Sequence, residues 1–91
     1  MADEAVAEAT KNYPHYRSHK VVQAAQIAHV GDPDVDGNRY IFFELGFPQI
    51  LCPAPMFARY VPVPGDYLVV YRDNYMSFSP KVELEDGYAQ F

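Results

Sequence analysis

The sequence lacks the features that mark secreted and membrane-bound proteins. Its one cysteine among 91 residues, Cys52, cannot form an internal disulfide, so nothing indicates an oxidising compartment. No apolar run approaches the roughly 18 residues that a membrane span needs. The Met1 end has no basic region followed by an apolar run, as a signal peptide would have. We therefore expect no membrane partner, and a soluble protein that is intracellular or assembled inside a cell.

Positive charge is also scarce. Seven lysines and arginines stand against twelve acids, which gives a formal net charge of -5 and an isoelectric point near 4.9. A net acidic domain repels the phosphates of nucleic acids and of anionic membranes. We therefore expect no nucleic acid partner.

Tryptophan is absent and glycine is sparse, whereas proline and apolar residues are plentiful. The chain has five glycines and eight prolines, and 49% of its residues are apolar. A chain of this length forms one domain, and this apolar content is enough for a core. The frequent prolines favour turns and short elements over long helices.

The clearest predicted element is a hairpin over residues 68–78. Residues 68–71 are rich in β-branched and aromatic residues, which suits a strand. Asp73 and Asn74 tolerate the positive φ that a tight turn of the primed types requires. Residues 75–78 form the return strand, and Pro80 ends it because proline has no N–H to donate.

Residues 20–30 predict a long first strand with apolar residues on both faces, as in a covered sheet or a small barrel. Val22, Ala24, Ala28 and Val30 share one face, and Val21, Ala25 and Ile27 share the other. The other expected elements are a loop over 31–38, strands over 39–44 and 47–51, a helical turn from Pro55, a helix over 81–86 ended by Gly87, and a strand over 88–91.

These elements predict a mainly β fold. We expect a small SH3-like barrel or a strongly bent antiparallel sheet, with one or two short helical turns and an N-terminal arm. Residues 1–12 are assigned to the arm, and residues 13–91 to a single β domain.

The arm is a strong helix former that is too short to hold alone and has only Val6 to bury. We therefore expect a partner subunit to hold it. Residues 13–30 contain Arg17 and Lys20 and no acid, so this basic patch could pair with the acidic arm of a neighbouring copy. The predicted partner contacts are Val6, Tyr13, Tyr16, Arg17, His19 and Lys20.

No motif predicts a catalytic or metal centre. Asp32, Asp34 and Asp36 begin like a calcium loop, but Phe43 occupies the position that needs a bidentate glutamate. His15 and His19 would share a face only on a helix, which Pro14 disfavours, and a third ligand is missing. Cys52 resembles a small buried thiol. We expect no enzyme, no cofactor and no metal.

Eight tyrosines exceed what a core of this size needs. Exposed tyrosines favour contacts, because they bring area at low entropic cost. The contact could be with a protein, or with the base of a nucleotide whose phosphate lies near Arg17, Lys20, Arg59 or Arg72. Alternatively, most of them rim the core.

Four segments have a pattern in common with known proteins: Tyr16-Arg17-Ser18-His19-Lys20-Val21-Val22-Gln23-Ala24, residues 65–71, Ser77-Phe78-Ser79-Pro80 and Gly87-Tyr88. In these segments the chain resembles a group of small, mostly uncharacterised tailed-phage and prophage proteins. It covers about residues 16–30 and 64–91, and Asn74 stands where many relatives would have glycine. It implies phage origin and a small β-rich fold, and it brings no catalytic residues.

Two functions follow as hypotheses. The first is a structural accessory protein of the virion, a capsid-decorating or cementing protein whose arm drapes over a neighbour. It would be assembled in the host cytoplasm, contact capsid or other virion proteins, and form a homo-oligomer within the assembly. The alternative is a counter-defence protein that sequesters a host nucleotide signal between subunits.

Overall fold

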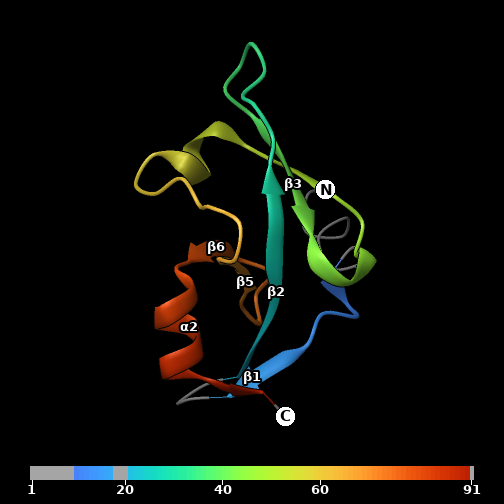
Figure 1. Ribbon diagram of the computed structural model, residues 1–91, viewed down its shortest axis with the longest axis vertical. Coiled ribbons are helices and arrows are strands. Elements are labelled where there is room, and N and C mark those ends of the chain that lie inside the picture. Colours follow the sequence, from blue (N-terminus) through green and yellow to red (C-terminus); the bar gives the residue numbers. More distant parts are fainter. Residues whose placement is uncertain (1–9, 18–20, 91) are drawn as a thin grey trace.

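The computed structural model describes residues 10–17 and 21–90 (Figure 1). Along the chain, its elements are β1 (His15–Arg17), β2 (Val21–Val30), β3 (Arg39–Phe43), the 3-10 turn η1 (Glu44–Gly46), β4 (Ile50–Cys52), the 3-10 turn η2 (Ala54–Phe57), β5 (Tyr67–Val70), β6 (Met76–Ser79), the helix α2 (Lys81–Gly87) and β7 (Ala89–Gln90).

The long strand β2 organises the sheet. Gln23 pairs with His15 of β1 and with Val70 of β5, so these two strands flank β2 on opposite edges. Farther along, Ile27 pairs with Phe43 of β3 while its main chain bonds Gly65 and Asp66 on the β5 side. Strands β1 and β3 therefore follow one another along the same edge. All pairings are antiparallel and the sheet is curled, which confirms the predicted mainly β, strongly bent fold (Figure 1).

The predicted faces of β2 hold only along its first half. Ala25 and Ile27 face the main core and Ala24 faces the other side, as expected. Val30 was expected on the side of Ala24, but it packs against the main core and pairs with Ile41. The register shifts between Ile27 and His29, and such a bulge moves every later side chain to the opposite face.

Two clusters cover the two faces of the sheet. The main core, between the curled sheet and η2, contains Tyr13, Ala25, Ile27, Ile41, Phe43, Cys52, Leu68 and Val70. The second cluster lies under α2 and contains Val22, Ala24, Tyr67, Val69 and Leu84. Because both faces of β5 are covered, all four of its residues are buried.

The segment between β4 and β5 closes the open side of the curl. The Phe57 ring stacks on Phe78 of β6 at 5.1 Å, and the Arg39 guanidinium lies 5.5 Å from the centroid of the Phe57 ring. These contacts join η2 to both β6 and β3. The main core is thereby enclosed without further strands.

Asp66 fixes the start of α2 to the same segment. Its Oδ2 accepts hydrogen bonds from the Tyr60 hydroxyl at 2.6 Å and the Val63 N–H at 2.9 Å, and its Oδ1 accepts one from the Lys81 N–H at 3.0 Å. Burial alone would raise the pKa of Asp66, but these three hydrogen bonds outweigh burial and hold it below its usual value.

The turn type of the hairpin and the start of the third strand differ from the prediction because of the local backbone conformation. The hairpin turn is not of a primed type, because only Asn74 has positive φ. The Asn74 N–H donates to the Tyr71 carbonyl oxygen, and the Tyr71 N–H donates to the Tyr75 carbonyl oxygen. These two bonds close a three-residue loop. The third strand begins at Ile50 rather than at residue 47, since Leu45 and Gly46 both adopt left-handed backbone and Pro48 has no N–H. The short strand β1 was not predicted.

Candidate functional site

The structure describes three of the six predicted contact residues, and it places Tyr13 in the core, apart from Tyr16 and Arg17 of β1. Tyr13 is 1% exposed and lies in the main core, with its ring 4.9 Å from Phe47. That burial leaves Tyr13 no surface for a partner, so it is removed from the candidate surface. Tyr16 packs edge-on against Tyr67 at 6.1 Å. Arg17 lies in β1, and Val6, His19 and Lys20 fall outside the described residues.

The described end of the predicted arm rests on its own chain. Thr10 is 1% exposed, and the Gln23 side-chain amide donates to the carbonyl oxygens of Thr10 at 2.9 Å, Lys11 at 3.3 Å and Tyr13 at 3.3 Å. Residues 10–13 are therefore anchored to β2 without a partner subunit. The rest of the predicted arm, residues 1–9, lies outside the described residues, so its contact with a neighbour stays a prediction.

The loop with three aspartates is built as a turn. The Asp34 Oδ1 accepts hydrogen bonds from the main-chain N–H groups of Asp36 at 2.9 Å and Asn38 at 3.0 Å. Among the residues that the structure describes, no three histidine, cysteine, aspartate or glutamate side chains gather as metal ligands do. The acidic loop therefore has a structural explanation.

The buried side chains of Cys52 and Tyr13 stay protonated at neutral pH. Cys52 is fully buried, as predicted, and burial raises the pKa of its thiol to about 12. Burial, and secondly the neighbouring Cys52, raises the pKa of Tyr13. A nucleophilic cysteine needs a thiolate, so Cys52 is a core residue at neutral pH.

An exposed cluster, the aromatic face, comprises His29, Tyr40, Phe42 and Leu51. Tyr40 and Phe42 alternate along β3 with the buried Ile41 and Phe43, so both point away from the main core. Cross-strand pairing places His29 opposite Phe42 and Leu51 opposite Tyr40. Directly opposite residues share a face of a sheet, so the four side chains form one continuous surface.

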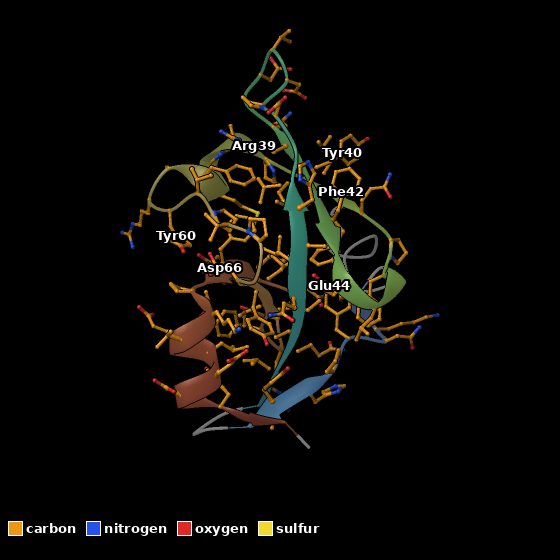
Figure 2. All side chains as sticks on the ribbon, in the orientation of Figure 1. Arg39, Tyr40, Phe42, Glu44, Tyr60 and Asp66 are labelled. Atoms are coloured by element: carbon orange, nitrogen blue, oxygen red, sulfur yellow. The ribbon has the colours of Figure 1, made fainter. Side chains whose placement is uncertain are left out.

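The aromatic face is open to solvent although most of it is apolar. Tyr40 is 48% exposed, Phe42 37% and Leu51 44%. The Phe42 ring lies 5.6 Å from His29 and 6.4 Å from Tyr40. In Figure 2, Tyr40 and Phe42 lie on one side of β3 and Arg39 on the other. Contiguous exposed apolar side chains on a sheet make this face a candidate interaction surface.

The charged residue that follows the aromatic face along β3 is an acid. None of its four described members is a lysine or arginine, and Glu44 follows at the end of β3. Arg39 lies on the opposite side, where it bonds the Gly31 carbonyl oxygen at 3.3 Å and covers Phe57. The face therefore suits a partner with an apolar centre and a basic rim.

Sequence reasoning located the strand of the aromatic face but not the face itself. The run from Arg39 to Phe43 was predicted as a strand, and its apolar residues alternate between two faces. Nothing in that run says which face the rest of the chain will cover.

Most of the tyrosines lie in the core or at its rim, as the alternative interpretation held. Tyr13 and Tyr67 are buried, and Tyr16, Tyr71 and Tyr88 pack against the second cluster. The exposed ones are Tyr40, Tyr60 and Tyr75.

A second candidate site, the tyrosine hollow, lies beside the β5–β6 turn. It measures about 460 Å³ and is lined by Val21, Tyr71, Arg72, Asp73 and Tyr75. The Tyr71 and Tyr75 rings are 5.8 Å apart. In a nucleotide site, aromatic rings stack on the base and an arginine binds the phosphate, and the tyrosine hollow has both kinds of group.

None of the helices in the described part of the chain is long and apolar enough to span a membrane. No protein-family model matches this chain, and no match was found among curated proteins or among solved structures.

Proposed function

We propose that this protein is a structural accessory protein of a tailed-phage virion, of the capsid-decorating or cementing type, and that it docks through the aromatic face. The observation that carries the proposal is the uncovered half of the sheet, where Tyr40, Phe42 and Leu51 stay between 37% and 48% exposed. A domain of this size gains little by leaving such residues in water unless something covers them.

The composition of the aromatic face suits protein contact. Aromatic residues are enriched in the centres of protein interfaces because they bring area and lose few rotamers. Burying a large apolar side chain completely contributes about 1.5–3 kcal/mol, so Tyr40, Phe42 and Leu51 can anchor an interface. The cross-strand pairing holds them in fixed positions before binding.

Protein is favoured over nucleic acid as the partner. Sheets that stack bases combine aromatic side chains with cations that follow the phosphates. The aromatic face has the rings, but Glu44 lies at its end and Arg39 points away from it. A strand of phosphates would meet no positive charge from its four members.

The resemblance to phage proteins supports the virion as the setting. It is carried by residues 16–24 and 65–71, together with Ser77-Phe78-Ser79-Pro80. The β-rich fold fits it too. The arm adds no support here, because residues 1–9 lie outside the described residues and residues 10–13 are hydrogen-bonded to Gln23 of β2.

Incorporation into particles tests the proposal. Phage that carry the gene are purified, and copies of the chain per particle are counted by mass spectrometry. We expect a stoichiometric copy number for the wild type, and a fall of about tenfold for the double variant Tyr40→Ser, Phe42→Ser. Tyr40 is 48% and Phe42 37% exposed, so binding gains somewhat less than half of the burial energy of each, and the two losses together come to about 1.4 kcal/mol.

Val82→Ser is the matched control, because Val82 is an exposed apolar residue of α2 outside the aromatic face. It should be incorporated like the wild type. Absence of the wild-type chain from particles would refute the virion role. Unchanged incorporation of the double variant would refute the aromatic face.

The second candidate function is sequestration of a nucleotide signal, favoured by the tyrosine hollow. The hollow has the size of a small-molecule site and joins Tyr71 and Tyr75 to Arg72. Thermal unfolding with a panel of cyclic nucleotides tests this function. A large rise in melting temperature with one nucleotide, lost in Arg72→Gln, would favour it over the virion role, since only a ligand that binds the native state stabilises it.

A further inference from the structure

Strand β6 has one unpaired edge. Within the described part of the chain it pairs only with β5, and all four of its residues are half-buried. It carries no charged residue and no proline, the two common devices that block an edge from further pairing. β6 is therefore open to an added strand.

The register shows which groups β6 presents. The Tyr71 N–H bonds the Tyr75 carbonyl oxygen, so Tyr71 and Tyr75 form a hydrogen-bonded pair. Hydrogen-bonded and non-hydrogen-bonded pairs alternate along an antiparallel ladder. The main-chain N–H and C=O groups of Ser77 and Ser79 therefore point toward their partners in β5, Val69 and Tyr67. The same groups of Met76 and Phe78 point outward.

The outward groups are almost unused. The Ser77 hydroxyl reaches the Phe78 carbonyl oxygen at 3.4 Å, and no other described residue bonds the outward groups of Met76 or Phe78. The outward groups recur at every second residue of β6. An extended peptide also presents its main-chain N–H and C=O groups on one edge at every second residue, so the two sets can pair.

A groove of about 720 Å³ runs beside this edge. Met76 and Phe78 contribute to one wall, and Pro55, Met56, Arg59 and Tyr60 to the other. Methionines and prolines give an apolar surface that adapts to different side chains. Arg59 is the only charged residue among the described residues that line the groove, so a partner with a carboxylate at that point would be matched.

We propose that this groove binds an extended segment of a partner protein, which adds to β6 as a further strand, bonds Met76 and Phe78 through its main chain, and places an acidic side chain on Arg59. This inference rests on the proposed role in protein contact, and it assigns that role a second surface. The aromatic face takes a folded surface, and the β6 groove takes a strand.

A second copy of this chain suits the groove less well. Its β6 has the residues Met76, Ser77, Phe78 and Ser79, which bring no carboxylate to Arg59. Two copies with a net charge of -5 each also repel one another. Pairing of two β6 edges is therefore treated as an outcome that the test can detect.

The probe is a displayed library of random twelve-residue peptides, selected on the full-length protein. The enriched peptides are synthesised and their affinities measured by calorimetry. We expect enrichment of sequences with an aspartate or glutamate at one fixed position. Met76→Pro removes an outward N–H while sparing the β5 ladder, and should weaken binding about tenfold, whereas the control Met76→Leu should not.

Two further measurements keep the test independent of the folding of Met76→Pro. N-methylation of alternate peptide amides, on the edge that faces β6, should also weaken binding about tenfold, and methylation on the other edge should not. Arg59→Glu should reverse the preference from the acidic peptide to the same peptide with lysine at that position.

Four results would overturn the inference: no enriched peptide, equal binding to Met76→Pro, indifference to the N-methylated edge, or a concentration-dependent dimer that Met76→Pro abolishes. The two proposals fail separately. The double variant Tyr40→Ser, Phe42→Ser should bind the peptides normally, so failure of the groove leaves the particle experiment unaffected.

Discussion

The two halves of the sheet differ in what covers the face opposite the main core. Along the first half of β2 and along β5, the helix α2 covers that face and Leu84 packs on Ala24 and Val69. Along the second half of β2 and along β3, nothing in the described chain covers it, and Tyr40 and Phe42 stay exposed. One half of the sheet is thus covered by α2, and the other half leaves apolar side chains exposed, which is the surface we propose for binding.

The covered half is held by specific bonds as well as by packing. Asp66 accepts from the first N–H of α2, at Lys81, and the Tyr67 hydroxyl donates to Glu85 of the same helix at 2.7 Å. The open half has no such attachment point among its four exposed residues. If the open half binds a partner as proposed, stability and binding are separated in this domain, which can be tested residue by residue.

The largest expected effect comes from shortening a leucine in each half. Leu84 is 1% exposed and Leu51 is 44% exposed. Leu84→Ala leaves a cavity under α2 and should lower the free energy of unfolding by about 2–5 kcal/mol. Leu51→Ala should lower it by less than about 1 kcal/mol, because much of this side chain is already in water.

Urea denaturation followed by circular dichroism measures both leucine variants. A similar loss in the two would show that the aromatic face contributes to stability as a core does. The proposed division of the sheet would then be wrong.

A smaller effect, which depends on pH, is expected from the attachment of α2. Because the pKa of Asp66 is lowered in the folded state, its contribution is present above the unfolded value of about 3.9 and is lost as the pH falls through the folded value. Asp66→Asn should destabilise the protein by about 2 kcal/mol at pH 7, since hydrogen bonds to a charged group are lost.

The pH dependence separates the charge of Asp66 from its packing. The difference in stability between the wild type and Asp66→Asn should shrink steadily below pH 4, when the carboxylate of the wild type is protonated. Chemical denaturation at pH 7, 4 and 3 measures this difference. A gap that stays constant over this range would show that the ionised carboxylate is not what holds the start of α2.

The sequence predicted the fold because the elements are marked by local chemistry. The alternation in β3, the proline after β6 and the apolar run of β2 each determine one element. The bulge at Ala28 was missed because no glycine or proline marks it, and it moved Val30 to the other face. Strand β1 was missed because its pairing with Val21–Gln23 is set by tertiary contacts rather than by its own residues.

The candidate site was less predictable, because exposure depends on the whole fold. Tyr13 and Tyr40 are the same residue type next to apolar neighbours, yet one lies in the core and the other on the surface. A bare strand face becomes visible only when the position of α2 is known. The free edge of β6 likewise depends on the absence of another described strand beside it.

The smallest expected effect compares one substitution, tyrosine to phenylalanine, on the two sides of the sheet. Under α2, Tyr67 donates its hydroxyl to Glu85, so Tyr67→Phe should cost about 1 kcal/mol. Beneath the open half, the Tyr13 ring packs on Phe43 at 5.5 Å and its buried hydroxyl has no hydrogen-bond partner among the described residues. Tyr13→Phe should therefore raise the free energy of unfolding, by about 1 kcal/mol, because it removes a buried polar group that gains nothing from the fold.

Urea denaturation measures the free energy of unfolding of both variants, and changes of opposite sign are the expected result. Destabilisation by Tyr13→Phe would mean that the hydroxyl is bonded after all, for which a buried water beside Cys52 is the first candidate, since such waters satisfy buried polar groups.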